Sequence, residues 1–156
     1  MRFCSIASGS SGNCIYVGSD NTHVLVDIGI SGKKMETGLN SLELTGRDLD
    51  GILITHEHSD HIKGLGVISR KYGIPIYATA GTVDAMVRTN ALGKIPEGIF
   101  HEIQEDEPFM INDLKVNPFT IPHDAAQPVG YRLEHEGHSV GIATDLGKYN
   151  DYIVKN

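Results

Sequence analysis

The sequence predicts an α/β (α+β) fold, and three observations support this class. Apolar runs rich in β-branched residues alternate with segments of helical period from residue 2 to about residue 92. From about residue 99 onward the chain is mostly strand-like, so strands also segregate along the sequence. Polar residues stand directly after several apolar strands, where α/β architectures collect ligands. The 156 residues, 40% of them hydrophobic, are enough for one domain with a core.

In the first part of the chain, strands and helices follow one another. The first three strands are expected to form an antiparallel meander, and the next strand is short and leads into a histidine-rich segment. The predicted strands are 2–7, 13–18, 23–28, 51–55 and 76–78, and the predicted helices are 32–44, 60–72 and about 81–92.

The second part of the chain is predicted to be β-rich until its last residues. A final helix is expected to begin near Lys148 and to run to Asn156. The expected strands are roughly 99–104, 108–121, 127–136 and 138–144.

Bulk properties narrow the function classes. The formal net charge of −7 argues against a protein that coats nucleic acid by electrostatics alone, although two divalent ions would offset about four negative charges. The apolar runs are too short to cross a bilayer, and residues 1–7 turn polar before a secretory segment could develop, which predicts a cytoplasmic protein. Cys4 and Cys14 lack C-x-x-C spacing and are expected to be buried thiols.

The most informative segment is the hexapeptide at residues 56–61, His-Glu-His-Ser-Asp-His, directly after an apolar strand. His56 and His58 are two residues apart and project to the same side of an extended segment, so both can bind one cation. A helix capped by Ser59 would bring the last two residues to a neighbouring position. Imidazole and carboxylate together are ligands for zinc, iron or manganese. The alternative is a solvated polar loop rich in histidine.

Three further polar residues stand at predicted strand ends, namely Asp27, His123 and Asp145. Each could be an ordinary turn or loop residue. Together with the hexapeptide, His123 and Asp145 are predicted ligands, and Asp27 is expected to accept hydrogen bonds from ligand imidazoles or loop amides. The glycine-rich loop at residues 8–13 either presents backbone amides to a phosphate or is a plain hairpin connection.

These residues carry a resemblance. The hexapeptide fits the pattern H-x-H-x-D-H, an Asp-Ile-Gly sequence at 27–29 precedes it, and His123 and Asp145 follow it. The combination resembles the metallo-β-lactamase superfamily, a broad class of mostly dinuclear metallohydrolases. Residues 7–13 and 48–56 resemble more narrowly the YycJ branch (also called VicX or WalJ), whose members are regarded as bacterial cytoplasmic nucleases.

The resemblance implies a site with two divalent metal ions, expected to be zinc, with manganese or iron as alternatives. A carboxylate as the ligand that bridges the two metals, here Asp145, resembles the phosphodiesterase, nuclease and glyoxalase II members of the superfamily. Asp60 would also be catalytic by orienting a water that the metals activate, and Asp27 would support the ligands. The implied ligands are His56, His58 and His123 for the first metal, Asp60 and His61 for the second, and Asp145 as the bridge between them.

The resemblance also implies an αββα sandwich, of which residues 1–156 are expected to form a single domain-like N-terminal half to two-thirds. The C-terminal part of that fold, which often supplies a further histidine, is absent from this sequence. The second metal site is therefore expected to be incomplete. A missing C-terminal segment or a second copy of the chain, as in a homodimer, would complete the fold and cover the exposed sheet.

Three functions stay open at this point. The first is a metal-dependent phosphodiesterase or nuclease, similar to a 5′-3′ exonuclease, with nucleic acid as substrate and no membrane partner. The second is a thioesterase or lactonase of the glyoxalase II kind. The third is a truncated half-domain that binds metal and has no activity of its own.

Overall fold

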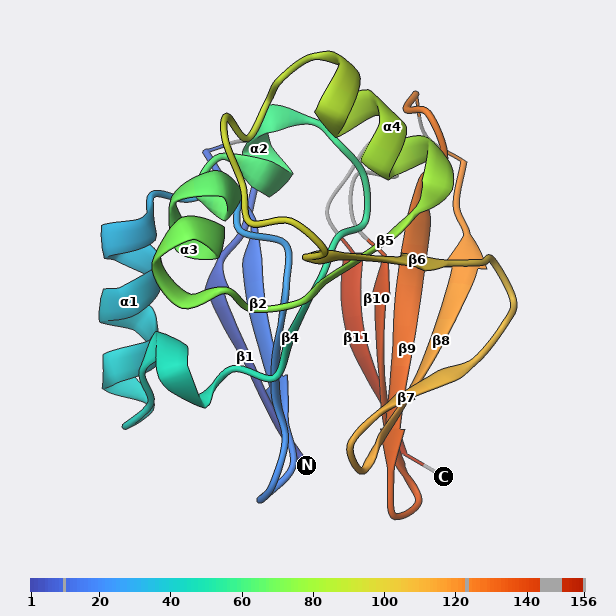
Figure 1. Ribbon diagram of the computed structural model, residues 1–156. Helices are drawn as coiled ribbons and strands as arrows, with labels where there is room; N and C mark the ends of the chain where they lie inside the picture. The colour runs from blue at the N-terminus through green and yellow to red at the C-terminus, as the bar shows by residue number, and fades with distance from the viewer. Residues whose placement is uncertain (10, 123, 144–149, 156) are drawn as a thin grey trace.

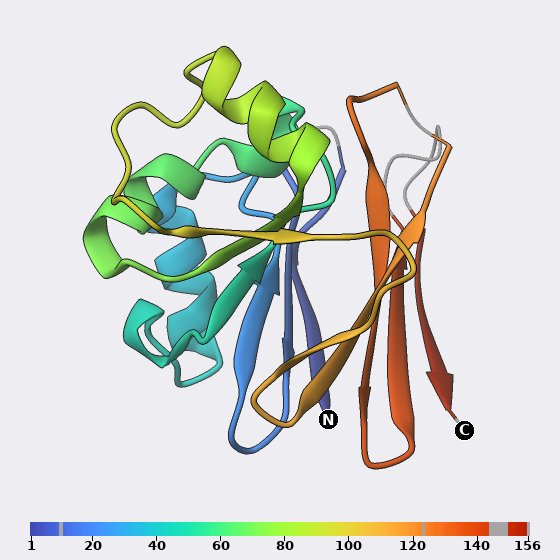
Figure 2. The ribbon, with the colours of Figure 1, turned by 45° about the vertical axis from the view of Figure 1, so that its right-hand side comes forward.

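The computed structural model describes residues 1–9, 11–122, 124–143 and 150–155. It forms three layers in the order helices, six-stranded sheet, five-stranded sheet (Figure 1). The two sheets lie face to face, and the helices lie on the outer side of the six-stranded sheet, as Figure 2 shows from a second direction. The expected α/β (α+β) class is confirmed.

The six-stranded sheet combines two kinds of strand pairing. Its first three strands form the predicted antiparallel meander, and the third to the sixth strands run parallel to one another. The predicted strands are confirmed with ends shifted by a few residues. In sheet order the strands are β1 (Arg2–Ala7), β2 (Cys14–Gly18), β3 (His23–Val26), β4 (Gly51–Leu53), β5 (Ile76–Thr79) and β6 (Phe100–Ile103).

The helices have clear start and stop signals. The Ser31 side chain accepts a hydrogen bond from the Lys34 amide at the start of the first helix, and Thr79 caps the last helix in the same way. The third helix ends at Gly73, whose φ of 64° favours glycine. The helices are α1 (Gly32–Ser41), α2 (Ser59–Ile62), α3 (Leu65–Tyr72), α4 (Ala80–Arg88) and a short 3₁₀ turn, η1 (Gly46–Asp48).

The second sheet is fully antiparallel between its neighbouring strands. Within the described part of the chain, all four α-helices lie on the far side of the other sheet, so this sheet has an uncovered outer face. In sheet order its strands are β11 (Asn150–Lys155), β10 (His138–Ala143), β9 (Val129–His135), β8 (Leu114–Thr120) and β7 (Phe109–Ile111).

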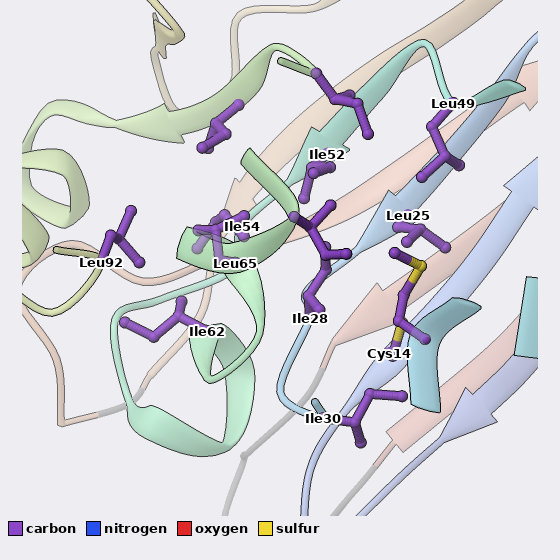
Figure 3. Packing of buried hydrophobic residues seen from close by; sticks show 14 of the residues in the cluster. Cys14, Leu25, Ile28, Ile30, Leu49, Ile52, Ile54, Ile62, Leu65 and Leu92 are labelled. Carbon is purple, nitrogen blue, oxygen red and sulfur yellow. The ribbon is translucent and has the colours of Figure 1, made fainter. Parts of the chain in front are cut away.

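Two apolar cores hold the layers together. One lies between the helices and the six-stranded sheet and includes Leu25, Ile28 and Ile52, with Leu65 from α3 (Figure 3). The other lies between the two sheets. Because β2 to β4 contribute to both cores, their residues are buried on both faces, which explains their continuous apolar runs. None of the helices in the described residues combines the length and apolar content needed to cross a bilayer.

Cys14 is fully buried and Cys4 is half-buried, and both thiols are free, so burial is confirmed for Cys14 alone. Burial also raises the pKa of the Cys14 thiol, which keeps it protonated.

The predicted helix 60–72 is wrong as a single element, because it divides into α2 and α3 at Gly64. The Gly64 amide donates to the Ile28 carbonyl at 2.8 Å, and a Cβ at Gly64 would lie 2.2 Å from the Ile30 carbonyl oxygen. This close approach of two backbones interrupts the helix. The predicted cap is also displaced: Ser59 is the first residue of α2, and the N-cap is His58, which makes no capping hydrogen bond through its side chain.

Two further predictions need correction in the β-rich part. The strand predicted at 108–121 is a hairpin of β7 and β8, because the chain turns at Asn112 with a φ of 50°. The helix predicted from Lys148 is wrong over residues 150–155, which form β11. That segment pairs antiparallel with β10, and sheet pairing overrides the local sequence preference.

Candidate metal centre

The carboxyl ends of two parallel strands bring the central residues of the site together. Val26 of β3 pairs with Leu53 of β4, and the Asp27 amide donates to the Leu53 carbonyl at 2.8 Å. Asp27 therefore lies beside Thr55, which is two residues after the end of β4. Both side chains are at most 1% exposed.

Asp27 accepts three hydrogen bonds from the segment around the hexapeptide. The Thr55 amide donates to Oδ1 at 2.8 Å, the Thr55 hydroxyl donates to Oδ2 at 2.7 Å, and His61 Nδ1 donates to Oδ2 at 2.6 Å. A carboxylate only accepts, so the proton of the neutral His61 ring is on Nδ1. The lone pair of His61 is therefore on Nε2, the atom through which this tautomer coordinates a metal.

Thr55 fixes the tautomer of His56 in a similar way. The Thr55 hydroxyl has one hydrogen, which it donates to Asp27, so it accepts from His56 Nδ1 at 2.9 Å. The lone pair of His56 is then also on Nε2. One buried carboxylate thus sets the tautomer of two fully buried imidazoles.

The rings of the hexapeptide converge. The centroids of His56 and His61 are 4.0 Å apart, and those of His56 and His58 are 4.7 Å apart in an edge-to-face arrangement. Asp60 Oδ2 is 3.7 Å from His61 Nε2. His56 and His61 are fully buried, whereas His58 and Asp60 are partly exposed, so the site opens to solvent on the side of the latter pair.

Two predicted ligands, His123 and Asp145, lie outside the described residues. Within the ranges that the structure describes, no three His, Cys, Asp or Glu side chains are arranged to hold a cation by themselves. The chemistry of the donors still fits a divalent cation. Two imidazoles have their Nδ1 atoms engaged by hydrogen bonds, so their lone pairs are on Nε2, which is the usual tautomer of metal-binding histidine.

Sequence reasoning gave no role to Asn13, which fastens the glycine-rich loop to the hexapeptide. The backbone amide of Asn13 donates to the Asp60 carbonyl at 2.8 Å. The side-chain Nδ2 has three acceptors within reach: Gly9 O at 3.1 Å, Asp60 O at 3.2 Å and His61 Nε2 at 3.2 Å. Nδ2 has only two hydrogens. The two backbone carbonyls can therefore satisfy Asn13 when His61 Nε2 binds another partner. The signal available in the sequence was an asparagine at the end of a glycine-rich run.

Gly29 allows the loop and the hexapeptide to meet. Its amide donates to the Asn13 carbonyl at 2.8 Å, and a Cβ at this position would lie 1.7 Å from the Asp60 carbonyl oxygen. The chain segments around residues 13, 29 and 60 therefore touch through their backbones.

Thr55 and Glu57 link the site to the connection between β8 and β9, and sequence reasoning also missed these roles. Glu57 Oε2 accepts from the Ala126 amide at 3.0 Å, and the Thr55 carbonyl accepts from the Val129 amide at 3.0 Å. The Tyr131 hydroxyl donates to the Ile54 carbonyl at 2.6 Å. The two sheets are thus joined directly beneath the hexapeptide.

Comparison with known proteins identifies the family. A family profile described as a β-lactamase superfamily domain matches residues 22–156. The chain belongs to the metallo-β-lactamase superfamily. The narrower resemblance is confirmed as well: exodeoxyribonuclease YycJ of Bacillus anthracis is 42% identical and exodeoxyribonuclease WalJ of Streptococcus pneumoniae is 40% identical, each over 151 residues. Each alignment covers 97% of this chain and 56% of the relative, so the chain spans little more than half the length of these proteins.

Solved structures show the same fold. A metallo-β-lactamase with a HARLDQ motif from Cronobacter sakazakii matches with a TM-score of 0.76 at 15% identity, over 94% of this chain and 59% of that chain. Zn²⁺-bound PqqB from Methylobacterium extorquens matches with a TM-score of 0.68 at 18% identity, over 85% of this chain and 52% of that chain. The expected metallo-β-lactamase fold, present in part, is confirmed.

Proposed function

We propose that residues 1–156 form the metal-binding part of an exodeoxyribonuclease, a metal-dependent hydrolase that cleaves phosphodiester bonds in DNA. The observation that carries the proposal is the buried hydrogen-bond chain from Asp27 through Thr55 and His61, which orients two imidazoles. The 40–42% identity to proteins named exodeoxyribonucleases supports this substrate class among the reactions of the superfamily. A cytoplasmic location and a single domain-like unit at 1–156 are part of the proposal.

The proposed centre holds two divalent ions, most simply zinc. When bound, such ions neutralise charge on a phosphate oxygen and lower the pKa of a bound water. Asp60, which is partly exposed and has Oδ2 3.7 Å from His61 Nε2, is proposed to bind a cation and to orient the attacking water. Asp27 and Thr55 keep the rings in place. The proposed ligands are His56, His58, Asp60, His61, His123 and Asp145.

The charge of the chain is compatible with a polyanionic substrate only when the centre is loaded. The formal net charge is −7, and two divalent ions would offset about four of these negative charges at the site. Metal binding would therefore create the local positive field that attracts a phosphodiester.

The rest of the sandwich is proposed to come from a further segment or from a second copy of the chain. The outer face of the β7–β11 sheet has no helix over it within the described residues, and the curated relatives are longer than this chain. The second metal position depends on this completion, because Asp60 and His61 are the two proposed ligands for it that the structure describes.

The test combines metal content with hydrolysis. The zinc-loaded chain is analysed for metal by elemental analysis and is given 5′-labelled and 3′-labelled DNA, bis-p-nitrophenyl phosphate and a thioester of the glyoxalase II kind. We expect bound zinc, stepwise shortening of DNA and faster turnover of the phosphate ester than of the thioester. His58→Ala is expected to lose the first metal.

A preference for the thioester would overturn the nuclease proposal in favour of the glyoxalase II reaction. A zinc-loaded chain that is monomeric and hydrolyses none of these compounds would favour a metal-binding half-domain without activity of its own. Full metal content in His58→Ala would show that the ligand assignment is wrong.

A further inference from the structure

A groove follows β6 at the open edge of the six-stranded sheet. One cavity of about 390 Å³ lies where the edges of the two sheets part, between β6 and β7. A second of about 410 Å³ lies at the carboxyl end of β6, next to the start of α4. Both have Glu102, Ile103 and Gln104 in their walls. We call the two cavities the β6 groove, and each is large enough for a small ligand or a side chain.

The floor of the first cavity is aromatic. The rings of Tyr77 and Phe109 are stacked with their centroids 5.3 Å apart and an interplanar angle of 18°. His101 adds a third ring, 5.0 Å from Tyr77. Tyr77 is held from below by Gly51, where a Cβ would lie 2.9 Å from the tyrosine ring. Half-buried stacked rings of this kind bind the planar guanidinium of arginine well.

The rim of the groove is acidic. Glu102 and Glu107 line the first cavity, and Glu102 and Glu105 line the second. Residues 95–114 contain six acidic residues and neither lysine nor arginine: Glu97, Glu102, Glu105, Asp106, Glu107 and Asp113. The charge of the rim repels a nucleic acid and attracts a cationic partner.

The backbone of β6 is available for pairing. β6 ends the sheet order, and no strand in the described residues pairs with its outer edge. The Ile76 amide donates to the Ile99 carbonyl at 2.9 Å. Because inward and outward groups alternate along a parallel pair, the amide and carbonyl groups of Phe100 and Glu102 face away from β5. An extended peptide could bind to these groups as an added strand.

We propose that the β6 groove binds an extended, arginine-containing segment of a partner protein, which adds to β6 as a further strand. Successive side chains of such a strand project to opposite faces of the sheet. Alternate arginines would therefore lie on the Tyr77–Phe109 floor beside Glu107, and the intervening residues would face the second cavity. This inference goes beyond the proposed nuclease activity and does not depend on it.

The experiment measures binding of a fluorescein-labelled peptide, Arg-Val-Arg-Thr-Arg-Val, to the 156-residue chain by fluorescence anisotropy. We expect saturable binding, and amide chemical-shift changes in the unmodified chain confined to β5, β6 and β7. Glu102→Gln combined with Glu107→Gln should weaken binding roughly tenfold or more. The matched control, Glu97→Gln combined with Glu136→Gln, removes the same charge outside the groove and should bind as the unmodified chain does.

Three results would overturn the proposal. The first is equal binding of a peptide in which glutamate replaces each arginine. The second is binding of single-stranded DNA to the chain with the same amide shift changes in β5, β6 and β7, which would assign the groove to nucleic acid. The third is shift changes at the hexapeptide or at a dimer interface of the chain in place of β6. Methylation of alternate peptide nitrogens tests the added strand separately, because one alternation should abolish binding and the other should preserve it.

Discussion

Each end of the sheet sandwich has an aspartate beside hydroxyl groups and a histidine, but the two aspartates have different roles. At the site, Asp27 accepts from the Thr55 hydroxyl and from His61. At the opposite end, Asp113 accepts from the Thr22 hydroxyl at 2.5 Å and from the Ser19 hydroxyl at 2.8 Å.

His135 also lies near Asp113, with its Nδ1 3.8 Å from Oδ2. The decisive difference is exposure. Asp27 is 1% exposed, whereas the side chain of Asp113 is 32% exposed. Because burial strengthens and fixes hydrogen bonds, Asp27 sets the orientation of two rings. Asp113 instead joins the β2–β3 turn to the β7–β8 turn and so holds one sheet against the other.

Substitution of the buried aspartate, Asp27, should have the largest effect of the changes considered. Asp27 has a φ of 64°, which asparagine also tolerates, so Asp27→Asn changes the carboxylate without straining the backbone. The variant loses an acceptor for His61 Nδ1 and Thr55. We expect zinc affinity, measured by chelator competition, to fall about 10–100-fold. Asp113→Asn is the matched control at the other end, and unchanged affinity in Asp27→Asn would contradict the orienting role.

Thr55→Val tests whether the hydroxyl relays the effect of Asp27 to His56. Valine keeps the shape of threonine but removes one of the three donors to Asp27 and the hydroxyl that accepts from His56 Nδ1. We expect the free energy of unfolding in urea to fall by about 1–3 kcal/mol. Thr55→Ser retains the hydroxyl and should recover most of that loss. If Thr55→Val were as stable as the unmodified chain, the hydrogen bonds of the Thr55 hydroxyl would not contribute to stability.

Asp113→Asn should have the smallest effect, and one that depends on pH. Hydrogen bonds from Thr22 and Ser19 hold the pKa of Asp113 below its ordinary value of 3.8. Because the pKa is lower in the folded state, ionised Asp113 stabilises the fold fully at pH values above the ordinary pKa. This stabilisation is lost as the pH falls through the folded-state pKa. The difference in thermal midpoint between the unmodified chain and the variant should therefore be largest near neutral pH and shrink in acid. A difference that grew in acid would assign the effect to another group.

The sequence predicted the elements better than their interruptions. The meander, the short strand before the hexapeptide and the helices after it are visible in apolar periodicity, because their burial pattern is local. The helix break at Gly64 and the strand at 150–155 cannot be seen in apolar periodicity, because each depends on pairing with a distant part of the backbone. Gly64 binds the Ile28 carbonyl, and residues 150–155 pair with β10.

The candidate site shows the same division. The donors of the hexapeptide are recognisable by residue type and spacing, as is the supporting acid Asp27. Asn13 and Thr55 carry common polar side chains, and their contacts with His61 and His56 appear only when three separate segments come together. Glu57 is similar, since its partner, the Ala126 amide, is 69 positions away in the sequence.

Gly29 has a consequence for protein engineering. Any side chain there would collide with the backbone carbonyl of Asp60. Transplanting the six-residue motif onto another scaffold would therefore transfer the donor atoms but not the close backbone contact at a glycine that keeps them aligned. A host that lacks such a glycine contact would need one to be built in before the transplanted rings could act together.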